Sequence, residues 1–360
     1  MNLQKVDITI KMTGMKTPCR VYLSASDDPW FNLALESRIF HTLDPDQQVL
    51  LIFKNRESVV LGRFQNPWIE CRMDILEEEK VCLVRRESGG GTVFHDPGNI
   101  NFSFMSGKAG YDRDSYFNIL IAALRRIGIP ADRTGRPVFT VEGKKVSGSA
   151  FRHIADRSYH HCTLLVDSDL TRLSHFLKPA ANSLESKGIA SVRSEVANLK
   201  EFVPSVTAAA VIDEVSAEFL QRYGGAAGAG RDDDRSGDES SIEVVEKGRW
   251  ARDPCFIKAC SELKSWDWIF GKTPPFTQRL SGPFGGGNLE AVIESRHGLI
   301  EKVTVVSDVL HPELITAVTE ALQNIPYSSK EVQEALRVLK GTEPAEALEG
   351  LCKWFAARIL

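Results

Sequence analysis

The sequence has no pair of cysteines at the spacing of a zinc site or a redox dithiol. Its seven cysteines are scattered along 360 residues, and none is followed by another three positions later. An odd, dispersed set is typical of reduced thiols, and several of them stand inside apolar runs, where cysteine behaves as a small buried hydrophobe. We therefore expect a reducing compartment and no disulfide framework.

Long apolar runs and a basic surplus are also missing. No stretch reaches the roughly 18 apolar residues of a membrane-spanning helix, so we expect no membrane partner. The formal charge of -4 and the pI near 6.1 argue against general nucleic-acid binding. With 42% hydrophobic residues, a chain of this length can bury a sizeable core and is expected to form two domains.

Composition and periodicity divide the chain into five parts. Residues 1–20 are an N-terminal extension with four basic residues against one acidic residue, a balance compatible with a mitochondrial presequence. Residues 21–223 are expected to form the first domain, 224–245 a flexible insertion rich in glycine and charge, 246–268 a linker, and 269–360 a small α+β accessory domain. We expect the mitochondrial matrix in a eukaryote and the cytoplasm otherwise.

Capping residues and hydrophobic spacing predict the main elements. Helices are expected from Pro29 through Ile39 with Asp28 as N-cap, from Arg113 to Ile127, and from Thr207 to Tyr223. Strands are expected at residues 49–53, 58–61, 81–84, 100–104 and 161–166, and hairpins within 139–147 and 289–306. These elements predict an α+β protein.

The first candidate for chemistry is the stretch of residues 85–95, which follows an apolar strand. Two arginines precede three consecutive glycines, and a histidine follows them. Glycines let the backbone approach a ligand and direct N–H groups at an anion. A glycine triplet between strands is often just a mobile turn, but the flanking cations favour an anion-binding loop. The pattern is neither a P-loop nor a dinucleotide fingerprint.

The second candidate is the lysine segment of residues 141–152. In a β-hairpin, alternation would place Lys145, Ser147 and Ser149 on one face and leave Lys144 outside. A single lysine could then project into a site beside two hydroxyls. Spacing alone equally allows both lysines to be exposed at the hairpin tip.

The third candidate is the histidine pair His160-His161. Neighbouring residues of a strand face opposite ways, and no acidic or cysteine partner stands at ligand spacing, so a metal site is disfavoured. We expect His161 to line a pocket and His160 to be covered. The sequence leaves the identity of any bound metal open.

Together these stretches resemble the lipoate-protein ligase and lipoyltransferase family. The resemblance covers nearly the whole chain from about Val21. Its marks are residues 65–68, 85–95, 145–150, 159–165, 187–193 and 265–268.

This resemblance implies a fold and a reaction. The fold is the α+β biotin/lipoate ligase-like fold, related to class II aminoacyl-tRNA synthetases, with a mixed sheet flanked by helices and a small α+β C-terminal domain. In the reaction, lipoate attacks ATP with the help of Mg²⁺ to give lipoyl-AMP, and an acceptor lysine then takes the lipoyl group. The implied acceptors are the lipoyl domains of 2-oxoacid dehydrogenase complexes and the glycine cleavage H protein. Octanoate is an alternative acyl substrate, and a monomer is expected.

The resemblance also assigns residues. The catalytic residue is Lys145, whose ammonium would bridge the carboxyl group of lipoate and the α-phosphate. The nucleotide-binding set is Arg86, Gly91, Thr92, Val93, Phe94 and Lys145. The lipoate-binding set is Ser88, Gly89, Gly90, His95, Lys145, Ser147 and His161.

One departure from the family pattern leaves alternatives open. Many members carry an acidic pair where this chain has Pro137-Val138, which puts the adenylating step in question. The alternatives are a transferase that takes the lipoyl group from lipoyl-nucleotide or from a lipoylated carrier, an octanoyltransferase, and an inactive lipoate-binding protein. An octanoyltransferase would need a cysteine nucleophile, and Cys162 is expected to be buried instead.

Overall fold

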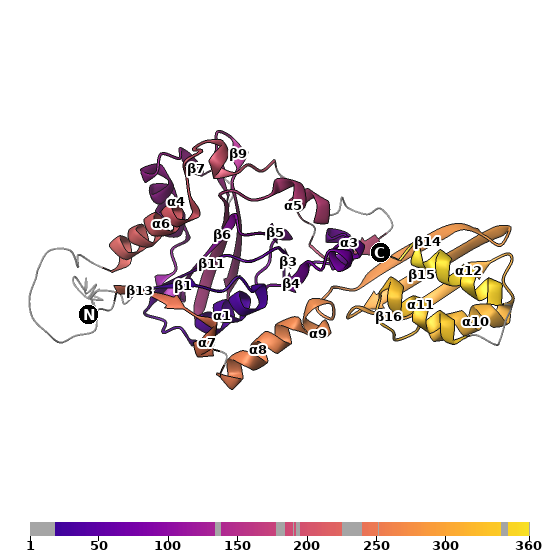
Figure 1. Cartoon of the computed structure of the whole chain (residues 1–360). Helices are drawn as coiled ribbons and strands as arrows, with labels where there is room; N and C mark the ends of the chain where they lie inside the picture. The colour runs from indigo at the N-terminus through magenta and orange to yellow at the C-terminus, as the bar shows by residue number, and fades with distance from the viewer. Residues whose placement is uncertain are drawn as a thin grey trace, which may run out of the picture.

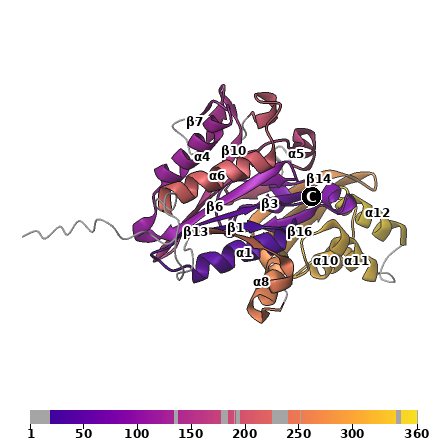
Figure 2. The same ribbon diagram turned by 60° about the vertical axis from the view of Figure 1, so that its left-hand side comes forward.

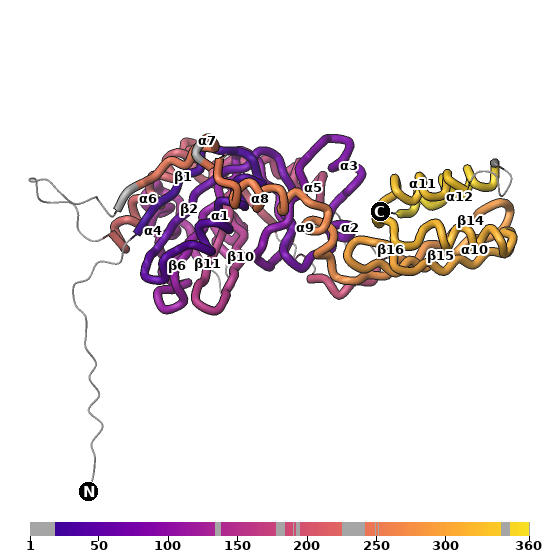
Figure 3. Tube along the Cα trace, turned by 90° about the horizontal axis from the view of Figure 1, so that it is seen from below, coloured from indigo at the N-terminus to yellow at the C-terminus, as the bar shows by residue number. Residues whose placement is uncertain are grey.

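The computed structural model describes residues 19–133, 138–177, 184–189, 191, 195–224, 240–250, 252–339 and 345–359, and the statements below refer to this part of the chain. It forms two bodies, and helices α8 (Pro254–Lys264) and α9 (Trp266–Ile269) lead from the first to the second (Figure 1). Seen from below, the second body extends the first lengthwise (Figure 3). None of the described helices is long and apolar enough to cross a bilayer.

The first body is built on a six-stranded mixed sheet in the order β10-β11-β6-β2-β1-β13. Strand β1 runs parallel to β2 and β13, and the other neighbours are antiparallel. The strands are β1 (Cys19–Ser24), β2 (Gln48–Phe53), β6 (Asn99–Gly107), β10 (Ser147–His153), β11 (Arg157–Leu165) and β13 (Ser240–Val245).

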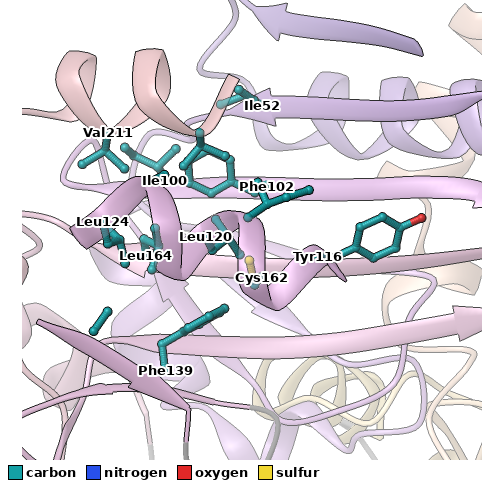
Figure 4. Packing of buried hydrophobic residues seen from close by; sticks show 14 of the residues in the cluster. Ile52, Ile100, Phe102, Tyr116, Leu120, Leu124, Phe139, Cys162, Leu164 and Val211 are labelled. Carbon is teal, nitrogen blue, oxygen red and sulfur yellow. The ribbon is translucent and has the colours of Figure 1, made fainter. Parts of the chain in front are cut away.

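Helices cover both faces of this sheet. Helices α4 (Arg113–Arg126) and α6 (Ala208–Tyr223) pack on one face, against strand residues such as Phe102 and Leu164 (Figure 4). Helices α1 (Pro29–Thr42) and α8 cover the other face, and Figure 2 shows α6 and α1 on opposite sides of the strands. Every residue of β2 and β6 is buried: β2 is apolar from Val49 to Phe53, whereas β6 alternates Ile100, Phe102 and Phe104 with buried polar residues.

Two three-stranded sheets flank the main sheet. One has the order β4-β3-β5 and the other the order β7-β8-β9. Their strands are β3 (Ser58–Leu61), β4 (Cys82–Arg85), β5 (Val93–His95), β7 (Ala131–Arg133), β8 (Phe139–Val141) and β9 (Lys144–Lys145). Short helical segments complete the body: α2 (Pro67–Glu70), α3 (Met73–Glu78), Lys108–Gly110, α5 (Leu170–Phe176), Leu199–Glu201 and α7 (Lys247–Trp250).

The second body is an antiparallel sheet covered by helices. Its order is β12-β14-β15-β16, and the edge strand β12 comes from the middle of the chain. The elements are β12 (Leu184–Ser186), β14 (Phe276–Phe284), β15 (Gly287–Arg296), β16 (Leu299–Ser307), α10 (Pro312–Ala321), α11 (Ser329–Val338) and α12 (Ala345–Ala356). Trp68 of α2 packs into this core against Phe276 and Tyr327, so the first body contributes both a strand and an aromatic side chain to the second.

The predicted α+β class and the main helices are confirmed, but two boundaries are corrected. The expected insertion at 224–245 is too long, because residues 240–245 form the edge strand β13 beside β1. The expected linker at 246–268 is largely helical and packs on the first body, with Phe256 in edge contact with Phe31 at 5.1 Å. Residues 1–18 and 225–239 lie outside the described part.

Replacing Phe104 by alanine should destabilise the first body. The ring is fully buried and stacks on Tyr116 at a centroid distance of 5.0 Å, so its loss leaves a cavity between β6 and α4. We expect the free energy of unfolding to fall by about 3–5 kcal/mol in denaturant titrations. The exposed control Val338→Ala should change it by less than about 0.5 kcal/mol. Equal stability of the two variants would contradict this packing.

Candidate active site

A glycine loop, residues 86–92, joins β4 to β5 at the edge of the small sheet. Both strands pair with β3, which brings the two ends of the loop together. Gly90 has a φ of +84°, a conformation that other residues rarely adopt. Below it lies Gly62, where a Cβ would come within 2.0 Å of the Gly90 carbonyl oxygen. The path of the loop therefore depends on a glycine in each of two segments.

Arg86 supports the glycine loop from within. Its Nη2 donates to the carbonyl oxygens of Gly89 at 2.6 Å and Gly91 at 2.7 Å. Its Nε donates to Ser88 Oγ and its Nη1 to Val60 O, both at 3.0 Å. Burial lowers the pKa of this guanidinium to about 10, so it keeps its charge at neutral pH. The side chain is placed to hold the loop, and a direct phosphate contact by Arg86 stays a prediction.

Arg85 connects the turn below the loop to the C-terminal end of α9. Its Nη1 donates to Gly62 O at 3.0 Å and Gln65 O at 2.8 Å. Its Nη2 donates to Ile269 O at 2.6 Å, and Trp268 Nε1 donates back to Arg85 O at 2.7 Å. This buried cation is thus satisfied mainly by carbonyl oxygens from two distant segments.

A hydrogen-bonded chain connects α1, β11 and the loop. His161 Nδ1 lies 3.1 Å from Glu36 Oε1, and His161 Nε2 lies 3.0 Å from Ser88 Oγ. A carboxylate only accepts, so Nδ1 carries a proton, and in the neutral ring Nε2 accepts from the Ser88 hydroxyl. Burial pushes the pKa of Glu36 up, but His161, Ser103 and Arg86 outweigh it and leave the pKa lowered. Both ring nitrogens of His161 are therefore engaged with protein groups.

His95 presents a buried donor beside the loop. Its Nδ1 accepts from Asn55 Nδ2 at 3.0 Å, and Asn55 Oδ1 in turn accepts from Asn32 at 2.8 Å. The proton of the neutral ring is then on Nε2, which has no hydrogen-bond partner among the described residues. Burial, reinforced by Arg86 and His161, lowers the pKa of His95 to about 3. The contact of His95 with lipoate stays a prediction, since this Nε2–H group is buried.

The far end of the loop is clamped by a second segment. Thr92 N donates to Ser191 Oγ at 3.0 Å, and the Thr92 hydroxyl donates to Gln65 Oε1 at 2.7 Å. Ser191 Oγ also accepts from Gln65 Nε2 and donates to Glu70 Oε2 at 2.5 Å. Thr92, Ser191 and the segment from Gln65 to Glu70 therefore fix this end of the loop together.

Lys145 ends strand β9 and lies against a continuation of that same segment. Its backbone N donates to Glu195 O at 3.2 Å, and its carbonyl oxygen accepts from Ala197 N at 3.0 Å. The side chain is half-buried, and burial lowers the pKa of its ammonium. Within the described part of the chain no carboxylate pairs with it, whereas the exposed Lys144 lies 3.6 Å from Glu201. Lys145 is thus the lysine turned toward the interior.

Comparison with known proteins now identifies the family. The family model of the lipoyl protein ligase A/B catalytic domain matches residues 28–220, more than half of the chain. The chain belongs to the lipoyl protein ligase family. The model of the bacterial lipoate protein ligase C-terminus matches residues 273–355, which make up most of the second body. The chain is also 41% identical, over 337 residues, to lipoate-protein ligase A of Psychrobacter cryohalolentis, covering 93% of this chain and 97% of that protein.

Solved structures of lipoate ligases have the same architecture. LipL1 of Plasmodium falciparum, crystallised in complex with lipoate, is 26% identical and superposes with a TM-score of 0.62, covering 94% of this chain and 99% of LipL1. A lipoate-protein ligase A bound with ATP is 21% identical with a TM-score of 0.54, covering 71% of this chain and 98% of that one. The predicted biotin/lipoate ligase-like fold is therefore confirmed.

Most of the predicted site residues of this ligase-family chain lie around the glycine loop, but Ser147 lies on the α4 face of the six-stranded sheet. Ser88, Gly89, Gly90 and His161 come together with His95 around the loop. Other predicted members are Gly91 and Thr92 at the clamped end, and Val93 and Phe94 in β5, where the Phe94 ring packs 5.5 Å from Phe176.

Ser147 lies apart from this group, and the prediction that Lys145, Ser147 and Ser149 share one face of a hairpin is corrected. In the β10–β11 register Ser147 pairs with Leu164 and Ser149 with Cys162, so both serines face α4 rather than the side of His161. The Ser147 hydroxyl accepts from Phe139 N at 2.8 Å. Lys145 belongs to a different small sheet, because the chain changes sheets between Lys145 and Ser147. The role of Ser147 in lipoate binding stays a prediction.

Several residues around the loop are missing from the sequence prediction. Glu36 and Asn55 lie outside every stretch singled out in the sequence, whereas Gln65 and Ser191 lie in stretches that carry the family resemblance but were assigned no role. A readable signal existed for Glu36, because a carboxylate inside the apolar run of α1 needs a partner if it is buried. Pro137, which stands where many family members carry an acidic residue, lies outside the described residues.

The buried histidines predict a loss of stability in acid. Burial lowers the pKa of His160, as that of His95, to about 3, whereas unfolded histidine titrates near 6.5. Below pH 6.5 the unfolded chain binds protons that the folded chain does not, so stability is fully present above that pH and is lost as pH falls towards 3. The slope per ring is about 1.4 kcal/mol per pH unit.

Denaturant titrations between pH 7 and pH 5 measure this effect. We expect His160→Asn to have a shallower pH dependence of stability than the parent. The exposed His311 is the matched control, since His311→Asn should keep the parental slope. Parallel slopes for the parent and His160→Asn would show that the ring is not held neutral.

Proposed function

We propose that this chain is an ATP-dependent lipoate-protein ligase, which activates lipoate as lipoyl-AMP and transfers the lipoyl group to a lysine of an acceptor protein. The observation that carries the proposal is the 41% identity to a lipoate-protein ligase A over 97% of that relative's length. The lipoate bound by P. falciparum LipL1 supports the acyl substrate, and the ATP bound by the structurally similar ligase supports the nucleotide.

Lys145 fits the chemistry of the first step. The carboxylate of lipoate must attack the α-phosphorus of ATP while pyrophosphate leaves, and the two anions repel each other. A half-buried ammonium without a carboxylate partner in the described residues can lie between them and stabilise the charge of the transition state. The role is electrostatic, because no bond to Lys145 has to form.

The glycine loop fits the placement of the adenylate. Its backbone is fixed by Arg86 from within and by Ser191 at its end, so few bonds need to reorganise when substrates arrive. In the second step the acceptor amine attacks the acyl carbonyl and AMP leaves. Because both nitrogens of His161 are engaged, that ring is a wall of the site rather than a base for the amine.

Magnesium is best treated as part of the nucleotide substrate. Within the described residues no group of three or more histidine, cysteine or acidic side chains forms a metal cluster. Near the loop, Glu36 pairs with His161 and Glu70 with Ser191. Mg²⁺ usually keeps several waters and binds through substrate phosphates, so it would arrive as Mg-ATP.

The acceptors are expected to be the lipoyl domains of 2-oxoacid dehydrogenase complexes and the glycine cleavage H protein, with octanoate as a second acyl substrate. These partners and a monomeric state are proposals from family resemblance, and a mitochondrial or cytoplasmic location is a proposal from the N-terminal residues. Incubation with an unlipoylated lipoyl domain, followed by mass measurement of that domain, tests the partner directly.

Replacing Lys145 by alanine should abolish most of the activity. With lipoate, Mg-ATP and acceptor, we expect lipoate-dependent pyrophosphate exchange and acceptor modification to fall by about 10²–10³-fold, the effect of losing one preorganised electrostatic group. The matched control is Lys144→Ala, whose exposed side chain pairs with Glu201. It should stay within about twofold of the parent. Undiminished lipoylation by Lys145→Ala would contradict the assignment.

The same assay separates a full ligase from a transferase. A ligase shows pyrophosphate exchange and modifies the acceptor with ATP. Modification from added lipoyl-AMP alone, with no exchange, would reject the adenylating step and favour the transferase.

Replacing Cys162 by alanine should leave transfer within about threefold of the parent, as expected for a conservative change away from the site. The thiol is buried on the α4 face of the sheet, and burial raises its pKa, so it is no thiolate nucleophile. A well-folded Cys162→Ala protein that forms lipoyl-AMP but no longer transfers the acyl group would favour the octanoyltransferase chemistry.

A further inference from the structure

Two residues with large exposed apolar side chains are joined by a backbone hydrogen bond next to the glycine loop. Phe64 is 54% exposed and Ile189 is 53% exposed, although 125 positions separate them in sequence. Ile189 N donates to Phe64 O at 3.3 Å, so the two residues are direct neighbours. We call them the apolar pair. Contiguous exposed apolar side chains held by a fixed backbone are typical of contact surfaces.

The apolar pair is bonded to the loop through its neighbours. Arg63 N donates to Ser88 O at 2.8 Å, and Gln65 Oε1 accepts from the Thr92 hydroxyl at 2.7 Å, so Phe64 lies between two residues that hold opposite ends of the loop. Gln65 Nε2 also donates to Ile189 O at 3.2 Å. The surface is therefore continuous with the reaction site and rigidly positioned relative to it.

Cations lie next to the apolar pair. Arg63 is partly exposed and lies over the Trp268 ring at 4.4 Å, which fixes its position. Lys187 is exposed two positions before Ile189. Gly188 allows close packing here, since a Cβ at that position would lie 3.2 Å from Phe64 O. The surface thus combines an apolar centre with basic neighbours in a protein whose net charge is negative.

We propose that the acceptor protein docks on Phe64 and Ile189, with Arg63 and Lys187 facing carboxylates on the acceptor. This inference rests on the proposed ligase function. An acceptor lysine has a stem of four carbons, so its backbone has to come close to the acyl group held at the loop. A surface that adjoins both ends of the loop meets this demand. The partner is a folded domain that presents its lysine on a turn, next to an apolar side chain and acidic residues.

The double variant Phe64→Ser/Ile189→Ser tests this surface. We expect the KM for an unlipoylated acceptor domain to rise about tenfold or more, since exposed apolar anchors dominate such contacts. The kcat at saturating acceptor and the rate of lipoate-dependent pyrophosphate exchange should stay at the parental values, because neither side chain contacts the loop interior. The conservative variant Phe64→Leu/Ile189→Val should restore most of the affinity.

Val306→Ser is the matched control. Val306 is 61% exposed and lies on β16, the sheet edge opposite β12, far from the apolar pair. It should leave the acceptor KM unchanged. Higher salt should raise the parental KM, because Arg63 and Lys187 attract acidic groups through screened charges.

The outcomes separate the two proposals. An unchanged acceptor KM in the double variant, with an active parent, overturns the docking surface and leaves the ligase function intact. Parallel loss of pyrophosphate exchange would also overturn it, because the damage would then lie in the loop. If sedimentation shows a dimeric parent and a monomeric double variant, and the two proteins have equal acceptor KM, the surface belongs to a contact with a second copy of the chain. A parent that modifies no acceptor even from lipoyl-AMP would instead overturn the ligase function.

Discussion

The buried guanidinium of Arg86 is the interaction on which the site depends. A loop of consecutive glycines has little intrinsic preference for one shape, and ordering it costs more conformational entropy than ordering any other residues. Arg86 offsets this cost by donating to the carbonyl oxygens of Gly89 and Gly91 and to Ser88. The carbonyl oxygens of Gly89 and Gly91 are thereby turned toward the guanidinium. A cation that holds the loop also makes its surroundings favourable for anions.

Much of the fold was readable from the sequence because local signals were strong. Asp28 with Pro29 caps α1 as predicted, α4 begins at Arg113 as predicted, and β6 and β11 follow the apolar runs. Strand β13 was hidden by the preceding glycine-rich segment and by its edge position, which leaves Ile242 and Val244 exposed. The short strand β12 has no local signal, because its pairing with β14 depends entirely on tertiary contacts.

The candidate site was predictable only in part, for a related reason. Motif residues such as Ser88, His161 and Lys145 were found because glycine, histidine and lysine clusters are conspicuous. Glu36, Asn55 and Ser191, which are the partners of His161, His95 and Thr92, come from distant segments, and hydrogen-bond partners that are remote in sequence leave no spacing pattern. The placement of Ser147 failed because the chain changes sheets after Lys145, which breaks the alternation expected of one hairpin. Tertiary register decides such positions.

The segment around Ser191 connects the two bodies mechanically. Residues 184–186 form a strand of the second body, Ser191 holds the end of the glycine loop, and residues 195–197 pair with Lys145. Few residues separate these three attachments, so little slack is available between them. A displacement of β12 would therefore act on the glycine loop and on Lys145 together. The second body is therefore linked through this one stretch of chain to the glycine loop and to Lys145.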